Sequence, residues 1–216
     1  MRLHNIEDQR SVTPELALSF LKEGNQRFVN NLKAHRNLLE QVNETKNGQF
    51  PFAAILSCID SRTSAELIFD QGLGDIFSIR IAGNVISEDV IGSMEFACKL
   101  AGSKLIVVLG HSKCGAITGA CKQVHLGHLT GLLEKVNPSI EFVKEHYANA
   151  DLSSVEGINL VATQHVDHTI TEILDKSQVL REMYENGEIG ILGAFYNVET
   201  GEVDFIKTMF LEKTAV

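Results

Sequence analysis

The chain has 216 residues, of which 44% are hydrophobic and 22% charged, the balance of an ordinary globular domain rather than of a disordered or fibrous protein. Its formal net charge of −9 gives it no general attraction for nucleic acid or for anionic membrane surfaces. No apolar run approaches the ~20 residues of a membrane span. We therefore expect a single domain over residues 1–216, with neither nucleic acid nor a membrane as a partner.

The amino-terminal stretch, residues 1–9, has no apolar signal core, so we expect a cytoplasmic protein. Cysteines in that compartment are thiols rather than disulfides, and their usual special roles are metal binding and catalysis. The four cysteines are Cys58, Cys98, Cys114 and Cys121.

The first predicted element is a helix that starts at Thr13-Pro14-Glu15. Thr13 can cap the helix, Pro14 needs no partner for an N–H group, and Glu15 favours the positive end of the helix. Its apolar side runs to Phe28, whereas residues 29–50 are polar and weakly patterned. We interpret residues 1–50 as an N-terminal helical arm that cannot form a core alone.

From residue 52 onward, predicted strands alternate with predicted helices. The strands are expected at 52–56, 76–80, 104–109, 189–196 and 203–206, and the helices at 88–100, 114–120 and 158–174. The last two strands flank a turn and form a hairpin. This order predicts an α/β fold: a central, mostly parallel β-sheet flanked by helices, with an antiparallel edge hairpin at the C-terminal end.

Two polar segments, 57–62 and 110–116, each follow a buried strand directly. If these strands are neighbours in a parallel sheet, both segments meet at one edge, where such sheets place their functional residues. Cys58, His111 and Cys114 would then offer two thiolates and an imidazole, the donor set that zinc prefers. Asp60 or a water molecule could be the fourth ligand. The plainer alternative is buried thiols and a capping histidine, but the combination of motifs favours zinc.

The other cysteines and histidines do not fit this site. Cys121 would lie two helical turns from Cys114, ~10 Å along the axis, too far to share one ion. Cys98 lies in an amphipathic helix and is expected to be a core residue. Four other histidines lack a nearby cysteine or carboxylate at ligand spacing: His125, His128, His165 and His168. We therefore expect one Zn2+ per chain.

At these residues the chain resembles the β-class carbonic anhydrases. The likeness covers about residues 48–206 and includes Cys58-x-Asp60-Ser-Arg62 and His111-x-x-Cys114-Gly-Ala. It also includes matching segments at 74–84 and 187–203.

The resemblance implies zinc on Cys58, His111 and Cys114, and Asp60 paired with Arg62 as the catalytic residues. It further implies substrate contacts from Gln49 and Phe77.

The expected activity is the reversible hydration of carbon dioxide to bicarbonate and a proton by zinc-bound hydroxide. Two alternatives stay open: a zinc hydrolase of a related small molecule such as carbon disulfide, and a non-catalytic zinc-stabilised binding domain. The family also dimerises, so we expect a homodimer or tetramer, with the apolar face of the arm helix packed on a neighbouring chain. Family members inhibited by a second bicarbonate carry a tryptophan where this chain has Ile55.

Overall fold

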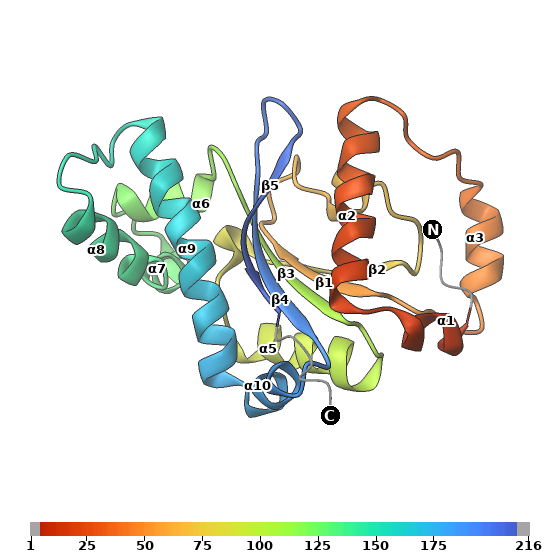
Figure 1. The fold of residues 1–216 in the computed structure, drawn as a ribbon. Coiled ribbons are helices and arrows are strands. Elements are labelled where there is room, and N and C mark those ends of the chain that lie inside the picture. The colour runs from red at the N-terminus through yellow and green to blue at the C-terminus, as the bar shows by residue number, and fades with distance from the viewer. Residues whose placement is uncertain (1–4, 211–216) are drawn as a thin grey trace.

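The computed structural model describes residues 5–210; residues 1–4 of the stretch that lacks a signal core, and residues 211–216, lie outside the description. The described chain contains a five-stranded sheet in the order β2-β1-β3-β4-β5. The strands are β1 (Ala53–Ser57), β2 (Ile76–Arg80), β3 (Leu105–His111), β4 (Gly190–Tyr196) and β5 (Val203–Met209). The first four are parallel, and β5 pairs antiparallel with β4 at the edge (Figure 1). The predicted fold class is therefore confirmed.

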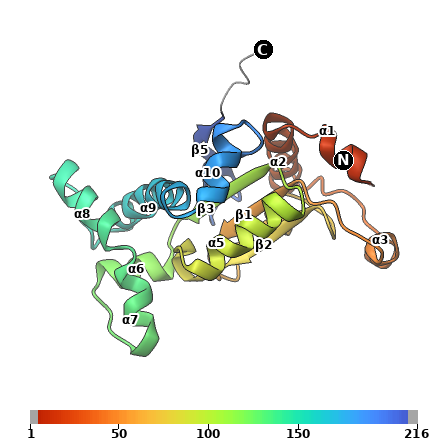
Figure 2. The same cartoon turned by 90° about the horizontal axis from the view of Figure 1, so that it is seen from below.

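Helices cover both faces of this sheet and extend beyond the carboxyl ends of its strands (Figures 1 and 2). Their bounds are α1 Ile6–Ser11, α2 Pro14–Val29, α3 Leu38–Thr45, α4 Ala65–Ile68, α5 Glu88–Glu95, α6 Gly115–Cys121, α7 Gly127–Glu134, α8 Asn137–His146, α9 Val155–Lys176 and α10 Gln178–Glu185. Two short helical turns, η1 (Ala82–Asn84) and η2 (Phe96–Leu100), complete the list, and η2 is a π-helical turn that continues α5. Within residues 5–210 no helix is both long and apolar enough to cross a membrane.

Helix α2 of the N-terminal arm packs on one face of the sheet. It begins as predicted, because the Thr13 hydroxyl accepts a hydrogen bond from the Leu16 amide at 3.2 Å. Its buried side, which includes Leu18 and Leu21, joins a core cluster with Ile55 of β1 and other strand residues. The expectation that this apolar face packs on a neighbouring chain is therefore wrong for α2: the face is buried against the sheet of its own chain.

Helices α5, α9 and α10 cover the opposite face. Because side chains alternate along a strand, Leu56 and Val108 point to this face while Ile55 points to the other. Leu56 and Val108 pack with Met94 of α5 and Ile170 of α9. Strands β1 and β3 are buried on both sides, as their continuous apolar runs predict.

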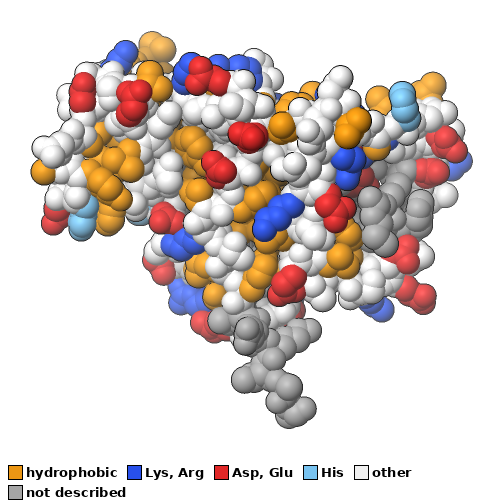
Figure 3. All heavy atoms as spheres, turned by 45° about the horizontal axis from the view of Figure 1, so that its top comes forward, with side chains coloured by type: hydrophobic (Ala, Val, Ile, Leu, Met, Phe, Trp, Pro, Cys, Tyr) orange, Lys and Arg blue, Asp and Glu red, His pale blue; other side chains and the backbone are white. Residues whose placement is uncertain are grey.

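A third cluster lies beyond the carboxyl ends of the strands, where α6, α7, α8 and the first half of α9 pack together. Cys58 and Cys114 belong to this cluster. On the face drawn in Figure 3, acidic and basic side chains are interspersed with hydrophobic ones, so the net charge of −9 is not gathered there into one acidic field.

Candidate metal centre

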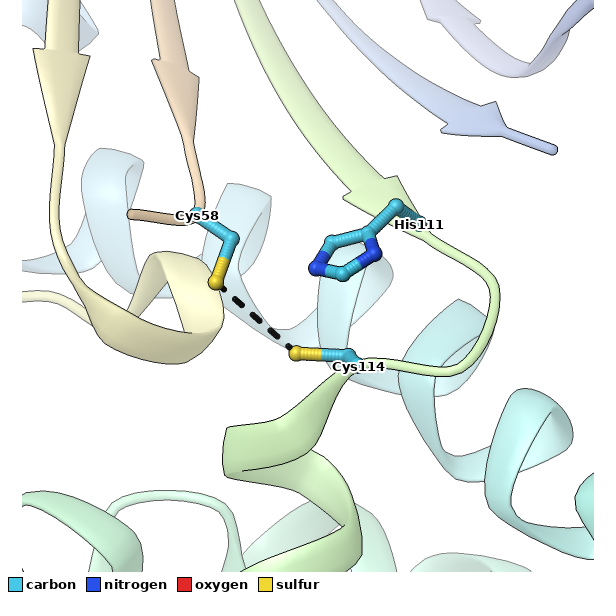
Figure 4. A group of neighbouring side chains, drawn as sticks. All are labelled: Cys58, His111 and Cys114. Carbon is cyan, nitrogen blue, oxygen red and sulfur yellow. Dashed lines mark hydrogen bonds between the residues drawn. The ribbon is translucent and has the colours of Figure 1, made fainter. Parts of the chain in front are cut away.

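Three side chains meet where β1 and β3 end. Cys58 follows β1 directly, His111 is the last residue of β3, and Cys114 immediately precedes α6. One ligand atom from each lies within 4.8 Å of the others, and the two sulfur atoms are 3.9 Å apart. In Figure 4 the three side chains point toward one another. The sequence prediction that these residues come together is confirmed, and the group can hold a metal ion.

His111 is oriented as a ligand. The ring is buried, and its Nδ1 atom lies 3.0 Å from the carbonyl oxygen of Ser112. The Nδ1–H group donates to that carbonyl, which leaves the lone pair on Nε2. Nε2 has no hydrogen-bond partner within the described chain. A buried ring nitrogen held in this way is suited to a metal ion.

The turn between His111 and Cys114 is fixed from two other elements. Lys113 has the uncommon backbone angle φ of 57°, and its amide donates to the Asn159 side chain of α9 at 3.0 Å. The Ser112 amide donates to the Tyr196 carbonyl at 2.9 Å, and the Val198 amide donates to the Ser112 hydroxyl at 3.0 Å. These contacts from the end of β4 and from α9 hold His111 and Cys114 in place. The sequence analysis did not identify them.

The two neighbouring thiols shift each other's pKa in opposite directions. A hydrogen bond from Cys114, with another from the Gly83 amide at 3.4 Å, lowers the pKa of the Cys58 thiol well below its usual range. The hydrogen bond with Cys58, burial and the charge of the Cys58 thiolate raise the pKa of Cys114. Two thiolates this close in a buried site repel each other, so a cation between them would favour the doubly ionised pair.

Asp60 and Arg62 form a two-pronged ion pair beside this group. Arg62 Nε donates to Asp60 Oδ1 at 2.9 Å and Nη2 donates to Oδ2 at 2.8 Å, while the Arg62 amide also donates to Oδ1 at 2.9 Å. The Arg62 guanidinium holds the pKa of the Asp60 carboxyl well below its usual range, so Asp60 is a carboxylate at neutral pH. In this arrangement the carboxylate is engaged with Arg62 and does not join the three side chains that meet at the metal group.

The backbone between Cys58 and Asp60 is clamped by two further residues. Arg80, at the end of β2, donates from Nε to the Cys58 carbonyl at 3.1 Å and from Nη2 to the Asp60 carbonyl at 2.6 Å. The buried Thr63 hydroxyl reaches the same two carbonyls, at 3.0 Å and 2.9 Å. The sequence analysis assigned no role to either. The only available signal was that Arg80 lies in the matched segment 74–84.

Gln49 and Phe77, by contrast, lie near the other end of the strands. Gln49 is exposed and precedes β1, whereas Cys58 follows it; at ~3.3 Å per residue the five residues of β1 span about 16 Å. Phe77 pairs with Ala54 near the start of β1 and makes an edge-to-face contact with Phe96, with the ring centroids 6.1 Å apart. Neither residue lies beside the metal group of its own chain.

A family model described as carbonic anhydrase matches residues 53–203. Carbonic anhydrase 2 of Mycobacterium tuberculosis is 37% identical over 199 residues, which cover 88% of this chain and 92% of that protein. A carbonic anhydrase of Mycolicibacterium smegmatis is 36% identical over 197 residues, again 88% and 92% of the two chains.

Solved structures show the same relationship. The β-carbonic anhydrase CcaA superimposes with a TM-score of 0.70 at 28% identity, over 86% of this chain and 93% of that one. A tetrameric β-carbonic anhydrase of Sordaria macrospora shares the fold, with a TM-score of 0.69 at 23% identity over 77% and 89% of the two chains. With its matched sequence, its mixed sheet and its Cys-His-Cys group, the chain belongs to the β class of the carbonic anhydrase family.

Proposed function

We propose that this protein catalyses the reversible hydration of carbon dioxide to bicarbonate and a proton, with one zinc ion per chain held by Cys58, His111 and Cys114. The observation that supports this most directly is the position of the Asp60–Arg62 ion pair next to a buried group of metal ligands. A purely structural metal site needs no such pair, so the arrangement favours catalysis over a zinc-stabilised binding domain.

The donor set fits zinc in its chemistry and in its spacing. Two thiolates and an imidazole are preferred zinc ligands. Two sulfur atoms that share one tetrahedral zinc ion at ~2.3 Å lie about 3.8 Å apart, close to the observed 3.9 Å. The unpartnered Nε2 atom of His111 supplies the third donor. Cys98 and Cys121 lie outside the group, which supports a single ion.

When bound, zinc supplies Lewis acidity that lowers the pKa of a coordinated water toward neutrality. The remaining work falls to the residues around it. The Asp60 carboxylate can accept a hydrogen bond from the attacking water and so direct an oxygen lone pair at the carbon of carbon dioxide. Arg62 keeps that carboxylate ionised and oriented through its two side-chain hydrogen bonds. We further propose that Asp60 can act as the fourth zinc ligand when it is released from Arg62.

A homodimer, or a tetramer built from dimers, would complete the site. The substrate contacts expected of Gln49 and Phe77 cannot be made to the metal group of the same chain, because the length of β1 separates them. A second copy related by two-fold symmetry could present them instead. Consistent with such a contact, edge strand β2 borders a groove of about 740 Å³ that is lined in part by Phe77 and Phe96.

The dimer would also cover apolar side chains of α3 that are exposed in one chain, including Leu38 and Leu39.

Carbon dioxide and bicarbonate are the proposed small-molecule partners. We place the enzyme in the cytoplasm, where thiol ligands stay reduced.

The proposal is tested by measuring carbon dioxide hydration and zinc content on the same preparations. The parent protein should bind one zinc per chain and be active, and Cys114→Ser should lose both properties. Cys121→Ser is the matched control, since Cys121 lies outside the metal group, and it should keep both. An inactive parent protein with full zinc content, or full zinc content in Cys114→Ser, would contradict the proposal.

A further inference from the structure

The loop between β1 and α4 carries both the Cys58 ligand and the Asp60–Arg62 pair. We propose that Thr63 is a positioning residue for this loop: its hydroxyl holds the carbonyls of Cys58 and Asp60, and through them the metal-ligating thiol and the carboxylate. This inference rests on the proposed function, because it assigns Thr63 a role in the same reaction.

The contacts of Thr63 are concentrated on these two peptide groups. Its side chain is buried, with 1% of the residue exposed. The hydroxyl oxygen lies 3.0 Å from the Cys58 carbonyl oxygen and 2.9 Å from that of Asp60, so its single hydrogen is shared between them. The Thr63 amide also donates to the Asp60 carbonyl, at 3.0 Å.

Arg80 reaches the same two carbonyls from another element. Its guanidinium comes from the end of β2 and donates to both. Arg80 is exposed, so water can replace part of what it supplies, whereas the Thr63 hydroxyl is buried and has no such substitute. We therefore expect loss of the Thr63 hydroxyl to disturb the loop more than loss of the Arg80 guanidinium.

The carbonyl positions matter because peptide groups are planar. Fixing the carbonyls of Cys58 and Asp60 fixes the planes that follow each residue, and so limits where their side chains point. The Arg62 amide lies within the same turn and donates to Asp60 Oδ1. If the turn opens, this hydrogen bond weakens and the Asp60 carboxylate becomes less well positioned. The three residues that would bind zinc are still present, so zinc should be retained.

Packing alone does not require a hydroxyl at this position. Valine has nearly the same shape as threonine but lacks the hydroxyl, so Thr63→Val removes the hydrogen-bond donor while keeping most of the side chain. The specific contribution of threonine is one hydrogen bond donor, and the two carbonyls of the loop are the acceptors it meets. Thr63 therefore acts through Cys58 and Asp60 rather than on the substrate.

The test compares Thr63→Val and Thr63→Ser in the zinc-loaded protein. Thr63→Val should keep its zinc and lower kcat about five- to tenfold, with KM changed by less than about twofold, as expected for a lost positioning hydrogen bond. Amide hydrogen exchange in residues 59–62 should become faster. Thr63→Ser, which keeps the hydroxyl, should stay within about twofold of the parent in kcat.

Thr169→Val is the matched control. Thr169 is also fully buried, but its hydroxyl has no hydrogen-bond partner within the described chain, and it lies on α9. The same chemical change there should leave kcat and the exchange of residues 59–62 at parent values.

Parent-like kcat and exchange in Thr63→Val would overturn the inference, and so would equal losses in Thr63→Val and Thr63→Ser. If Thr63→Val does not fold, Thr63→Ala against Thr63→Ser decides in the same way: equal values overturn the inference, and a slower Thr63→Ala supports it. A parent protein without hydration activity would refute the proposed function instead, and the exchange data would still decide whether Thr63 holds the loop.

Discussion

Acidification from about pH 7 to about pH 5 should destabilise the fold through His165, a histidine outside the metal group. His165 lies on α9 with 1% of the residue exposed, and its Nδ1 atom is 3.1 Å from the Ser139 hydroxyl oxygen. Burial lowers the pKa of His165 to about 4; the neighbouring His168 adds to this effect and Glu172 opposes it. The folded protein therefore keeps this ring neutral over a pH range in which an exposed histidine is protonated.

The sign and the size follow from the two pKa values. In the unfolded chain the pKa of the histidine is about 6.5, so below that pH the unfolded state binds a proton that the folded state does not. Stability is lost as the pH falls from about 6.5 toward about 4, where the folded protein begins to bind the proton too. At about pH 5 the difference in proton binding amounts to about 2 kcal/mol.

Denaturant unfolding of the zinc-loaded protein measures this loss. His165→Gln removes the titrating ring and keeps an amide that can meet Ser139. Because the packing of the buried ring is lost, we expect the variant to be less stable than the parent near neutral pH. The stability difference between parent and variant should shrink by about 2 kcal/mol between about pH 7 and about pH 5. Subtracting the two proteins cancels the pH effects that both share, including those at the metal group.

The matched control is His125→Gln, at an exposed histidine. Its stability difference from the parent should not change over the same pH range. A difference between parent and His165→Gln that is equally constant, within about 0.5 kcal/mol, would refute the reasoning.

Three further predictions concern the site and the packing of the arm. Asp60→Asn should keep zinc and lose most of the hydration activity, because an amide is a poorer acceptor for a proton; an active variant in a stopped-flow assay would contradict this. Gly24→Ala should lower the free energy of unfolding by about 3 kcal/mol or more, because the new Cβ atom would lie 1.7 Å from the Phe69 carbonyl oxygen of the chain beneath α2; an unchanged melting temperature would contradict the packing described. Bicarbonate should not inhibit cooperatively, because the buried Ile55 cannot provide the packing and hydrogen bonding of an indole; sigmoidal inhibition in steady-state kinetics would show otherwise.

The sheet and the metal group could be predicted because their signals are local. Strand 76–80 has the predicted bounds, and the other predicted strands overlap β1, β3, β4 and β5. Apolar runs of this kind mark strands that are buried on both faces. Cys58, His111 and Cys114 follow two such strands directly, so the topology of a parallel sheet was enough to bring them together.

The features that were missed leave no clear signal in the pattern of residue types along the sequence. Helix α3 was missed because residues 29–50 are polar and the helix leaves Leu38 and Leu39 exposed. The burial of α2 could not be assigned to its own sheet, because an apolar helix face does not identify its partner. Thr63 and Arg80 act on backbone carbonyls, and such bonds leave no pattern of residue types. A motif match can likewise assign Gln49 a substrate contact, but it does not show in which chain of a dimer that contact would be made.

The most direct test of the account is to titrate zinc into metal-free protein while following carbon dioxide hydration. We predict no activity above the buffer rate without metal, a linear rise as zinc is added, and a plateau at one zinc per chain. Full activity in the metal-free protein, or a plateau at two zinc ions per chain, would contradict a single catalytic zinc on Cys58, His111 and Cys114.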